Sequence, residues 1–408
     1  MAKRNSMRDG PLAQLFKATE GGQSAEADEQ PAEPPAPRPK RQAARPQLID
    51  LPEPDDSGAS PFPRPDGQPY LAVIRVVGVG GGGCNAVNRM IESDVKGVEF
   101  IAVNTDIQQL QMSDAPTKIH IGREQTQGLG SGADPDVGRT SAEGSYDRIK
   151  TVLRGSDMVF VTAGEGGGTG SGAAPVIARI AREVGALTVG IVTAPFAFEG
   201  SRRGSQARGG VEALREAADT VIVIPNDRLL EVLEKGTPLV DAFRIADDVL
   251  RQGVQGICDL ITLPGLINLD FADVRAVMSD AGTAMMGIGM ATGPNRAAEA
   301  ATRAVRSPLI DHEVRAARGI LLSISGGSDL SLHEVNEAAE IVRAASDDRT
   351  NIIFGASVDE QLAGQIWVTV VATGFSMTGG SSASGGQAGR PAALPPDDLL
   401  EPPSFLQS

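Results

Sequence analysis

Cysteine and histidine are scarce in this sequence, and aromatic residues make up only 3% of it. The two cysteines, Cys84 and Cys258, do not make a disulfide framework, and we expect both to be small buried side chains of a protein from a reducing compartment. The three histidines stand at no spacing that suits metal binding. The sequence therefore argues against a disulfide-rich secreted protein and against a zinc protein.

Long apolar runs and an excess of basic residues are also missing. No stretch reaches the ~18 apolar residues of a membrane span, and the N-terminus has no secretory apolar segment. The formal net charge of −15 disfavours nucleic acid and anionic membranes as direct partners. We therefore expect a cytoplasmic protein without direct membrane insertion, in which backbone N–H groups rather than a basic surface would hold a nucleotide.

Glycine, by contrast, is abundant, with 49 residues clustered in loops between apolar segments. Over residues 70–237, strands that are apolar throughout alternate with helices, which predicts a doubly wound, mostly parallel α/β sheet. A long connecting helix is expected at 238–263, because apolar residues recur there with helical spacing and Pro264 follows. Residues 264–375 are expected to form a smaller α+β domain.

Both ends of the chain differ in composition from this ordered body. Residues 1–69 are rich in Pro, Ala and charged residues, which predicts a disordered extension. Residues 376–396 are a Gly/Ser/Pro linker. Residues 397–408 regain Leu and Phe, and an apolar cluster after a linker is typical of a peptide that binds a partner; a frayed terminus is the alternative.

The first glycine-rich loop, "GVGGGGCN", suggests a dinucleotide. Gly78, Gly80 and Gly83 match the fingerprint G-x-G-x-x-G, and Asp106 follows about twenty residues later at the end of a strand. A carboxylate so placed binds the ribose in NAD enzymes. Taken alone, the motif favours an NAD-dependent dehydrogenase, although four successive glycines satisfy many patterns.

A second glycine-rich loop changes this interpretation. "GEGGGTGSG", residues 164–172, lies between a strand and a helix but lacks the lysine of a P-loop, and a third turn, "GLGSGADP", occupies residues 128–135. Several such loops suit a triphosphate better than a pyrophosphate. Thr169 and Ser171 add hydroxyl donors at a helix N-terminus, where anions are favoured. Together with backbone N–H groups and a bound Mg²⁺, they can replace the missing lysine.

These loops belong to a longer series of motifs. "GVGGGGCNAVNRMI", "AVNTD", "GGGTGSG", "APFAFEGSRR", "IPNDRLL", "DAFRIADDVL" and "NLDFADVRAVMSDAG" occur in this order within residues 71–375. In them the chain resembles FtsZ, the family of bacterial tubulin-like cell-division GTPases. The resemblance implies a tubulin/FtsZ-like GTPase domain that hydrolyses GTP to GDP and phosphate, with Mg²⁺ held mainly by the phosphates rather than by protein side chains.

The resemblance also implies partners and a location. The chain would polymerise head to tail with copies of itself into the filaments of the division ring, at the mid-cell division site. Its tail would bind membrane-tethering and regulatory division proteins, although "EPPSFLQS" lacks the basic ending that is usual in the family.

A set of residues would bind the nucleotide if the resemblance holds. The residues that contact the phosphates, the ribose and the base would be Gly81, Gly82, Gly83, Cys84, Asn85, Gly168, Thr169, Gly170, Glu199, Arg203, Asn226, Phe243 and Asp247. Phe243 would stack on guanine, and Asp247 would accept hydrogen bonds from its N1–H and exocyclic amine. Adenine has no hydrogen at N1, so a carboxylate there selects guanine. The alternative is that Phe243 is a core residue and Asp247 a solvated one.

Three further residues, Asn268, Asp270 and Asp273, follow the long helix. If a helix begins there, Asp270 caps it and shares a face with Asp273. The resemblance implies instead that this loop enters the nucleotide site of a neighbouring subunit, where the acids position and polarise the attacking water. From Phe243 to Leu260 the helix spans on the order of 25 Å. One molecule cannot bring the nucleotide pocket and the acids at opposite ends of this helix together, so hydrolysis is expected between stacked subunits.

Two positions depart from the family pattern. Glu165 stands where an apolar residue such as Met is usual, and Asp134 replaces the usual Asn. Because a carboxylate near a phosphate repels it, we expect Glu165 either to face away from the phosphates or to help hold Mg²⁺. Both acids leave open a second hypothesis, a tubulin-like filament protein that binds GTP but hydrolyses it poorly.

Overall fold

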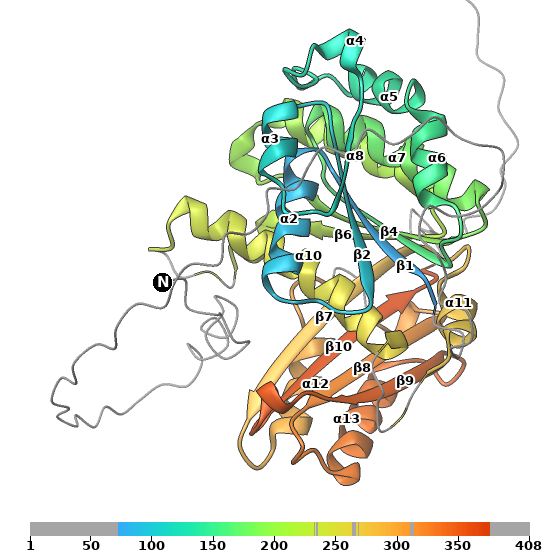
Figure 1. The fold of residues 1–408 in the computed structure, drawn as a ribbon. Helices are drawn as coiled ribbons and strands as arrows, with labels where there is room; N and C mark the ends of the chain where they lie inside the picture. Colours follow the sequence, from blue (N-terminus) through green and yellow to red (C-terminus); the bar gives the residue numbers. More distant parts are fainter. Residues whose placement is uncertain are drawn as a thin grey trace, which may run out of the picture. The chain divides into compact units, whose positions relative to one another are not determined.

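One mixed sheet of ten strands runs through the part of the chain that the structure describes (Figure 1). This computed structural model describes residues 72–375 except 232, 234–235, 263–266, 268 and 311–313. The predicted N-terminal extension, linker and tail peptide lie outside the described residues. The strand order is β3-β2-β1-β4-β5-β6-β7-β10-β8-β9. The strands are β1 (Ile74–Val79), β2 (Val98–Asn104), β3 (Thr117–His120), β4 (Met158–Gly164), β5 (Leu187–Ala194), β6 (Thr220–Pro225), β7 (Gly282–Thr292), β8 (Gly319–Gly326), β9 (Asn351–Val358) and β10 (Gln365–Thr373).

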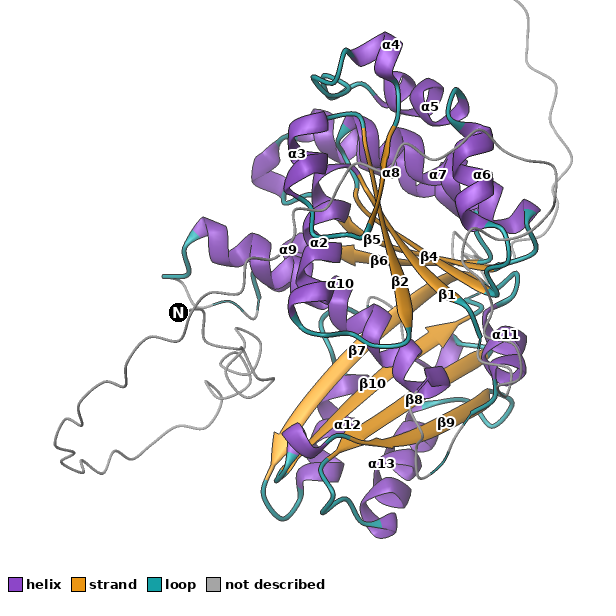
Figure 2. Cartoon of the chain, in the orientation of Figure 1, coloured by secondary structure: helices purple, strands orange, loops and turns teal. Residues whose placement is uncertain are grey.

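Helices cover both faces of this sheet, as Figure 2 shows. They are α2 (Gly80–Glu92), α3 (Ile107–Met112), α4 (Arg123–Thr126), α5 (Pro135–Glu143), α6 (Tyr146–Leu153), α7 (Gly168–Glu183), α8 (Ser201–Ala217), α9 (Asn226–Leu229), α10 (Leu239–Thr262), α11 (Phe271–Met278), α12 (Arg296–Val305) and α13 (Leu332–Ala345). Short 3₁₀ turns are η1 (Ala197–Glu199), η2 (Val314–Ala316) and η3 (Glu360–Leu362).

The strands from β3 to β6 are parallel and buried on both faces, which explains their continuously apolar sequences. Side chains of α2 and α10 pack on one face, and those of α6, α7 and α8 pack on the other. The strand order reverses between β1 and β4, because β1 leads to β2 on one side and β4 leads to β5 on the other. The predicted fold class, a doubly wound and mostly parallel α/β sheet, is confirmed.

Residues 140–155, "TSAEGSYDRIKTVLRG", are divided between two helices, because α5 ends at Glu143 and α6 begins only at Tyr146. Helix α5 begins at Pro135, where the Asp134 side chain accepts a hydrogen bond from the N–H of Asp136 and so caps it. The third glycine-rich turn therefore leads directly into a helix.

The C-terminal strands continue the same sheet. Strand β7 pairs in parallel with β6 over a short register that begins at Thr220 and Gly282, and β10 then runs antiparallel to β7 and β8. Helices α12 and α13 cover one face of this part, and α10 contributes to the core on the other. The two regions expected from the sequence thus share one sheet, and α10 packs across both.

Candidate functional site

A crevice for a ligand is expected where the strand order of a doubly wound sheet reverses, at the carboxyl ends of the strands. Here that point lies after β1 and β4, whose ends lead into α2 and α7 on opposite faces. Helix α2 begins at Gly80, immediately after β1, so residues 81–85 lie in its first turns rather than in an open loop. The residues before both helices, Val79 and Gly167, make no side-chain cap. The first N–H groups of both helices can therefore bind an anion.

Glycine is required where the two phosphate loops meet. A Cβ atom on Gly82 would lie 3.2 Å from Gly164, and one on Gly80 would lie 3.0 Å from the backbone nitrogen of Gly170. A Cβ atom on Gly170 would lie 2.4 Å from the carbonyl oxygen of Gly164. No side chain fits between the loops, so the crevice is lined by backbone, as a phosphate cradle needs.

Not every predicted glycine-loop residue faces the crevice. A Cβ atom on Gly83 would lie 2.3 Å from the carbonyl oxygen of Thr162, which shows that Gly83 lets α2 approach β4. Cys84 is buried, and its thiol points to the carbonyl oxygens of Gly78 and Val103 at 3.8 and 3.9 Å. Burial raises the pKa of Cys84 to about 12. Any contact of Cys84 with a phosphate would therefore use its backbone N–H and not its thiol.

Hydroxyl groups link the second glycine-rich loop to the third glycine-rich turn and to the end of β2. The hydroxyls of Thr105 and Thr169 share a hydrogen bond of 2.6 Å, and Thr169 also lies 3.1 Å from the hydroxyl of Ser131 in the third turn. The sequence predicted the role of Thr169 as a donor to phosphate but missed Thr105 and Ser131. A threonine directly after β2 and a serine within "GLGSGADP" were the available signals, since hydroxyls at strand ends commonly bind neighbouring loops.

Glu165 does not face the crevice. Its side chain is 2% exposed and lies against Gly210 of α8, where a Cβ atom would be 2.2 Å from its Oε2 atom. Of the two expectations for this residue, the structure supports the one in which it turns away from the phosphates. The Asp106 side chain accepts hydrogen bonds from the N–H groups of Gln108 and Gln109 and so caps α3. It is not placed as the ribose-binding carboxylate of an NAD enzyme.

Residues predicted to hold the ribose lie after β5 and β6. Glu199 accepts a hydrogen bond from the N–H of Phe196 and pairs with Arg203 at 3.1 Å. Asn226, at the start of α9, is buried, and its Oδ1 atom has no hydrogen-bond partner within the described part of the chain. A buried acceptor without a donor is costly, and the hydroxyl or N–H of a nucleoside would satisfy it.

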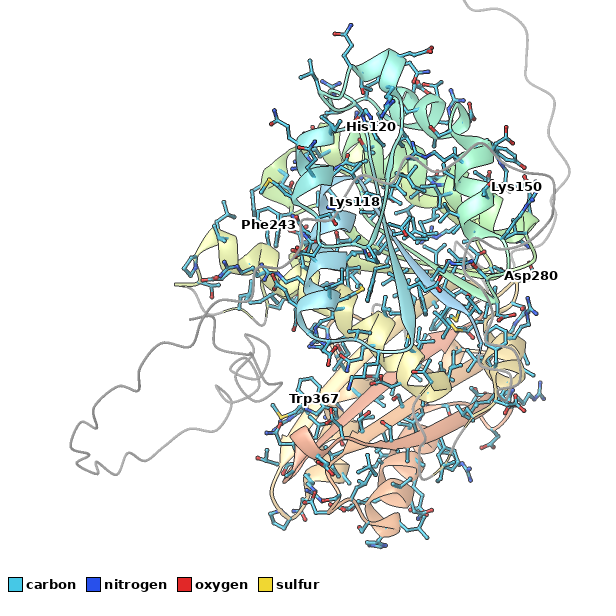
Figure 3. All side chains as sticks on the ribbon, in the orientation of Figure 1. Lys118, His120, Lys150, Phe243, Asp280 and Trp367 are labelled. Carbon is cyan, nitrogen blue, oxygen red and sulfur yellow. The ribbon has the colours of Figure 1, made fainter. Side chains whose placement is uncertain are left out.

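Phe243 and Asp247 lie one turn apart on α10, on the same face. Phe243, which Figure 3 labels, is 38% exposed. It meets Phe196 edge to face, with ring centroids 5.4 Å apart. Asp247 is partly buried; burial raises its pKa to about 7, Arg89 of α2 opposes this shift and Asp248 adds to it. An exposed ring beside a half-buried carboxyl fits a base better than the alternative of a core Phe and a solvated Asp.

The predicted catalytic acids lie near the amino ends of the parallel strands, whereas the crevice lies at the carboxyl ends. Asp270 caps α11 by accepting a hydrogen bond from the N–H of Asp273 at 2.9 Å, and both side chains are exposed. Asn268 lies outside the described residues. Helix α11 is held next to the amino ends of β5 and β6, where Arg275 donates to the carbonyl oxygen of Gly185 and Thr220 donates to that of Met278. Strand β5, of eight residues, separates this edge from the crevice by roughly 25 Å.

The described residues contain neither a cluster of metal-binding side chains nor a membrane-spanning helix. No group of three or more His, Cys, Asp or Glu side chains there could hold a metal ion. No described helix is both long enough and apolar enough to cross a bilayer.

Two family models match the chain. The GTPase domain of the Tubulin/FtsZ family matches residues 73–234, and the C-terminal domain of the FtsZ family matches residues 282–376. Among solved structures, an empty FtsZ dimer from M. jannaschii is 45% identical, covers 75% of this chain and 89% of its own, and has a TM-score of 0.73. The chain belongs to the FtsZ family. The resemblance drawn from its motifs is therefore confirmed.

FtsZ membership gives residues 73–234 a GTPase domain in place of a dehydrogenase domain. Two proteins from Haloferax volcanii share the fold at lower identity. A GTPγS-bound protofilament of CetZ2 is 22% identical, with a TM-score of 0.64, and covers 75% of this chain and 94% of its own. A GDP-bound CetZ1 monomer is 19% identical, with a TM-score of 0.66 and coverage of 75% and 95%.

Alanine substitutions in the second glycine loop should separate packing from nucleotide contact. At Gly168 a Cβ atom would lie 2.2 Å from the hydroxyl of Ser131, so Gly168→Ala should destabilise the protein by about 1–3 kcal/mol. At Gly167 nothing lies within 4 Å, so Gly167→Ala should keep the stability yet weaken GDP binding about tenfold. Gly209→Ala, on α8 with equal space, is the control. Thermal unfolding and GDP titration report both effects; undiminished GDP binding by Gly167→Ala would exclude this phosphate contact.

Proposed function

We propose that the protein is a self-assembling GTPase that polymerises head to tail into the filaments of a bacterial division ring and hydrolyses GTP between adjacent subunits. One observation carries the proposal: the nucleotide crevice lies at the carboxyl edge of the parallel strands, and the exposed acids of α11 lie at the amino edge. Stacking one edge on the other brings both parts together. Because the two surfaces differ, the contact repeats without closing and generates a filament.

Within one subunit the described residues suit a guanine nucleotide. The N-termini of α2 and α7 would hold the phosphates through backbone N–H groups, with residues 81–83 and 168–170 closest to them. Glu199, Arg203 and Asn226 would hold the ribose, and Phe243 and Asp247 the base. The two H. volcanii structures are bound to GTPγS and to GDP, which is consistent with this use of the fold.

Magnesium fits this site as a partner of the phosphates. The crevice has no cationic side chain on its glycine loops, so the charge of a triphosphate needs a counter-ion there. Mg²⁺ usually keeps several waters and binds substrate phosphates with few protein ligands, which agrees with backbone-lined loops. When bound, it would neutralise negative charge on the β- and γ-phosphates.

The acids of the neighbouring subunit would complete the reaction. Asp270, Asp273 and Asn268 would orient a water molecule in line with the γ-phosphorus of GTP, and a carboxylate would accept its proton as the new P–O bond forms. The bond from the γ-phosphorus to the bridging oxygen breaks, and GDP and inorganic phosphate leave. Most of the barrier to phosphoryl transfer is lowered by positioning and charge stabilisation, which short acidic side chains on a fixed helix can supply.

The dependence of turnover on protein concentration tests this proposal directly. If the reaction centre needs two subunits, phosphate release per subunit should be negligible when monomers predominate and should rise steeply as filaments form. Phosphate release and light scattering, measured together over a dilution series, should change at the same concentration. A rate per subunit that stays constant across the series would show that a single molecule is self-sufficient, and the proposal would then be wrong.

The division-ring role also requires a link to the membrane. We propose that residues 397–408 bind membrane-tethering and regulatory division proteins and that the filaments act at mid-cell. Family membership, a tail with an apolar cluster and a net charge that disfavours direct membrane contact support this part of the proposal.

A further inference from the structure

Glu165 is a buried acid that the proposed reaction does not use. It lies between Gly164 and Gly166 in the loop that joins β4 to α7, and its side chain is 2% exposed. Neither of its carboxyl oxygens has a hydrogen-bond partner of good geometry within the described residues. A buried and unpaired carboxylate is strongly disfavoured, so the neutral acid is the form that this position accommodates best.

The elements packed around Glu165 offer no charge to stabilise its ionised form. Helix α8 presents Gly210, and α7 presents the hydroxyl of Ser171, whose oxygen accepts a hydrogen bond from the N–H of Gly166 at 2.8 Å. Strand β5 presents the carbonyl oxygen of Thr193, which accepts the N–H of Glu165 at 2.9 Å. The carbonyl group of Arg203 packs against Gly166. The Arg203 guanidinium group pairs with Glu199 at 3.1 Å.

The residues on either side of Glu165 build the phosphate cradle. Gly164 meets Gly82 and Gly170, and Gly166 is held through Ser171 in the first turn of α7. A negative charge on Glu165 would therefore lie next to the loop that is proposed to hold the phosphates, and it would repel them. It would also favour movement of the side chain towards water, and the loop would move with it because no ion pair within the described residues holds the carboxyl group in place.

We propose that the protonation of Glu165 controls nucleotide affinity, with the neutral carboxyl supporting the phosphate loop and the ionised carboxyl weakening its hold on phosphates. This inference rests on the proposed guanine-nucleotide site. Burial raises the pKa of Glu165 to about 7, and Ser171 partly opposes that shift. Bound phosphates would raise this pKa further, so binding takes up a proton. By linkage, affinity falls as pH rises above about 7, by at most tenfold per pH unit.

The test compares GDP binding by the full chain and by variants between pH 6.5 and 8.5, with GDP chosen because it is not hydrolysed. Glu165→Gln keeps the shape of the neutral acid but cannot ionise. Glu216→Gln, on the exposed side of α8, is the control for loss of a carboxylate. From pH 7 to 8.5 the parent and Glu216→Gln should lose affinity about five- to tenfold relative to Glu165→Gln. The GDP phosphate titrates equally in all three and cancels.

Calorimetry gives a second measurement, in which the parent is compared with two variants of different chemistry. GDP titrations near pH 7.5 in two buffers of different ionisation enthalpy should reveal proton uptake that Glu165→Gln, or the similarly sized Glu165→Met, lacks. Identical pH profiles and identical proton uptake in parent and variants would overturn the inference while leaving the nucleotide site intact. A folded parent that binds no guanine nucleotide at any pH would instead overturn the proposed function.

Discussion

Replacing Asp273 by Asn should abolish most GTP turnover while leaving GTP binding and filament assembly in place. The side chain is exposed on α11, far from the crevice of its own chain, so its loss should not disturb nucleotide binding. A positioned acid or base contributes 10²–10⁴-fold to such reactions, and we expect a loss on the order of 10²-fold or more. Phosphate release, GTP binding and sedimentation of filaments measure the three properties separately.

Asp270 needs a different substitution because it has a structural role as well. Its side chain caps α11, and Asp270→Ala would remove the cap and cost about 1 kcal/mol of stability. Asparagine caps a helix nearly as well as aspartate, so Asp270→Asn removes the charge and keeps the cap. Asp280→Asn, which breaks an exposed ion pair with Arg182 just after α11, is the control and should hydrolyse GTP normally. Full activity of Asp273→Asn would refute its catalytic assignment.

Mixing two inactive variants tests whether the centre is shared. Asp273→Asn retains an intact crevice, and a variant of Asp247 retains intact acids. In a random copolymer of equal parts, about one interface in four pairs the intact crevice with the intact acids, provided that both variants enter filaments. Turnover should then return to a fraction of the parental rate, and sedimentation confirms that both variants are present. If two polymerising variants regain no activity, each subunit must supply both halves itself.

The sequence predicted the α/β sheet because its strands are buried on both faces and therefore read as unbroken apolar runs, such as "MVFVTAG" in β4. It did not predict that helix α2 begins at Gly80, since four glycines have low helix propensity. Packing outweighs that propensity here, because only glycines let α2 and α7 approach the ends of β1 and β4. The sequence also did not predict that the first residues of β7 pair with β6, because strand pairing between distant segments leaves no local pattern.

The site was predictable where residue type alone limits the chemistry and not where orientation matters. A glycine loop before a helix indicates an anion site whatever the details. The orientation of Glu165 depends on Gly210, which lies 45 positions later in the sequence. Because Gly210 has no side chain, the carboxyl group of Glu165 has space to turn away from the phosphates. The link between Thr105 and Thr169 likewise joins two loops that only the folded sheet brings together.

Asp247→Ala should lower GTP affinity more than a hundredfold and remove the preference for guanine over other bases. A carboxylate that accepts the N1–H and the exocyclic amine makes two charge-assisted hydrogen bonds, each contributing about 1.5–3 kcal/mol. Inosine triphosphate lacks the amine, so the parent should bind it at least tenfold more weakly than GTP. In Asp247→Ala this difference should vanish. Asp241→Ala, in the first turn of α10 and two residues before Phe243, is the control.

The pH dependence of GDP binding gives Asp247 a second signature. Burial raises the pKa of Asp247 to about 7 in the free protein, and only its ionised form can accept hydrogen bonds from the N1–H and the exocyclic amine of guanine with both oxygens. Guanine binding lowers this pKa, so a proton is released and affinity falls as pH decreases below about 7, by at most tenfold per unit. Glu165, which must be neutral, acts in the opposite direction at higher pH. Affinity should therefore peak near neutral pH, and Asp247→Ala should lose the acidic limb while Glu165→Gln loses the alkaline one. An acidic limb that survives in Asp247→Ala would assign it to another group and remove the carboxylate from base recognition.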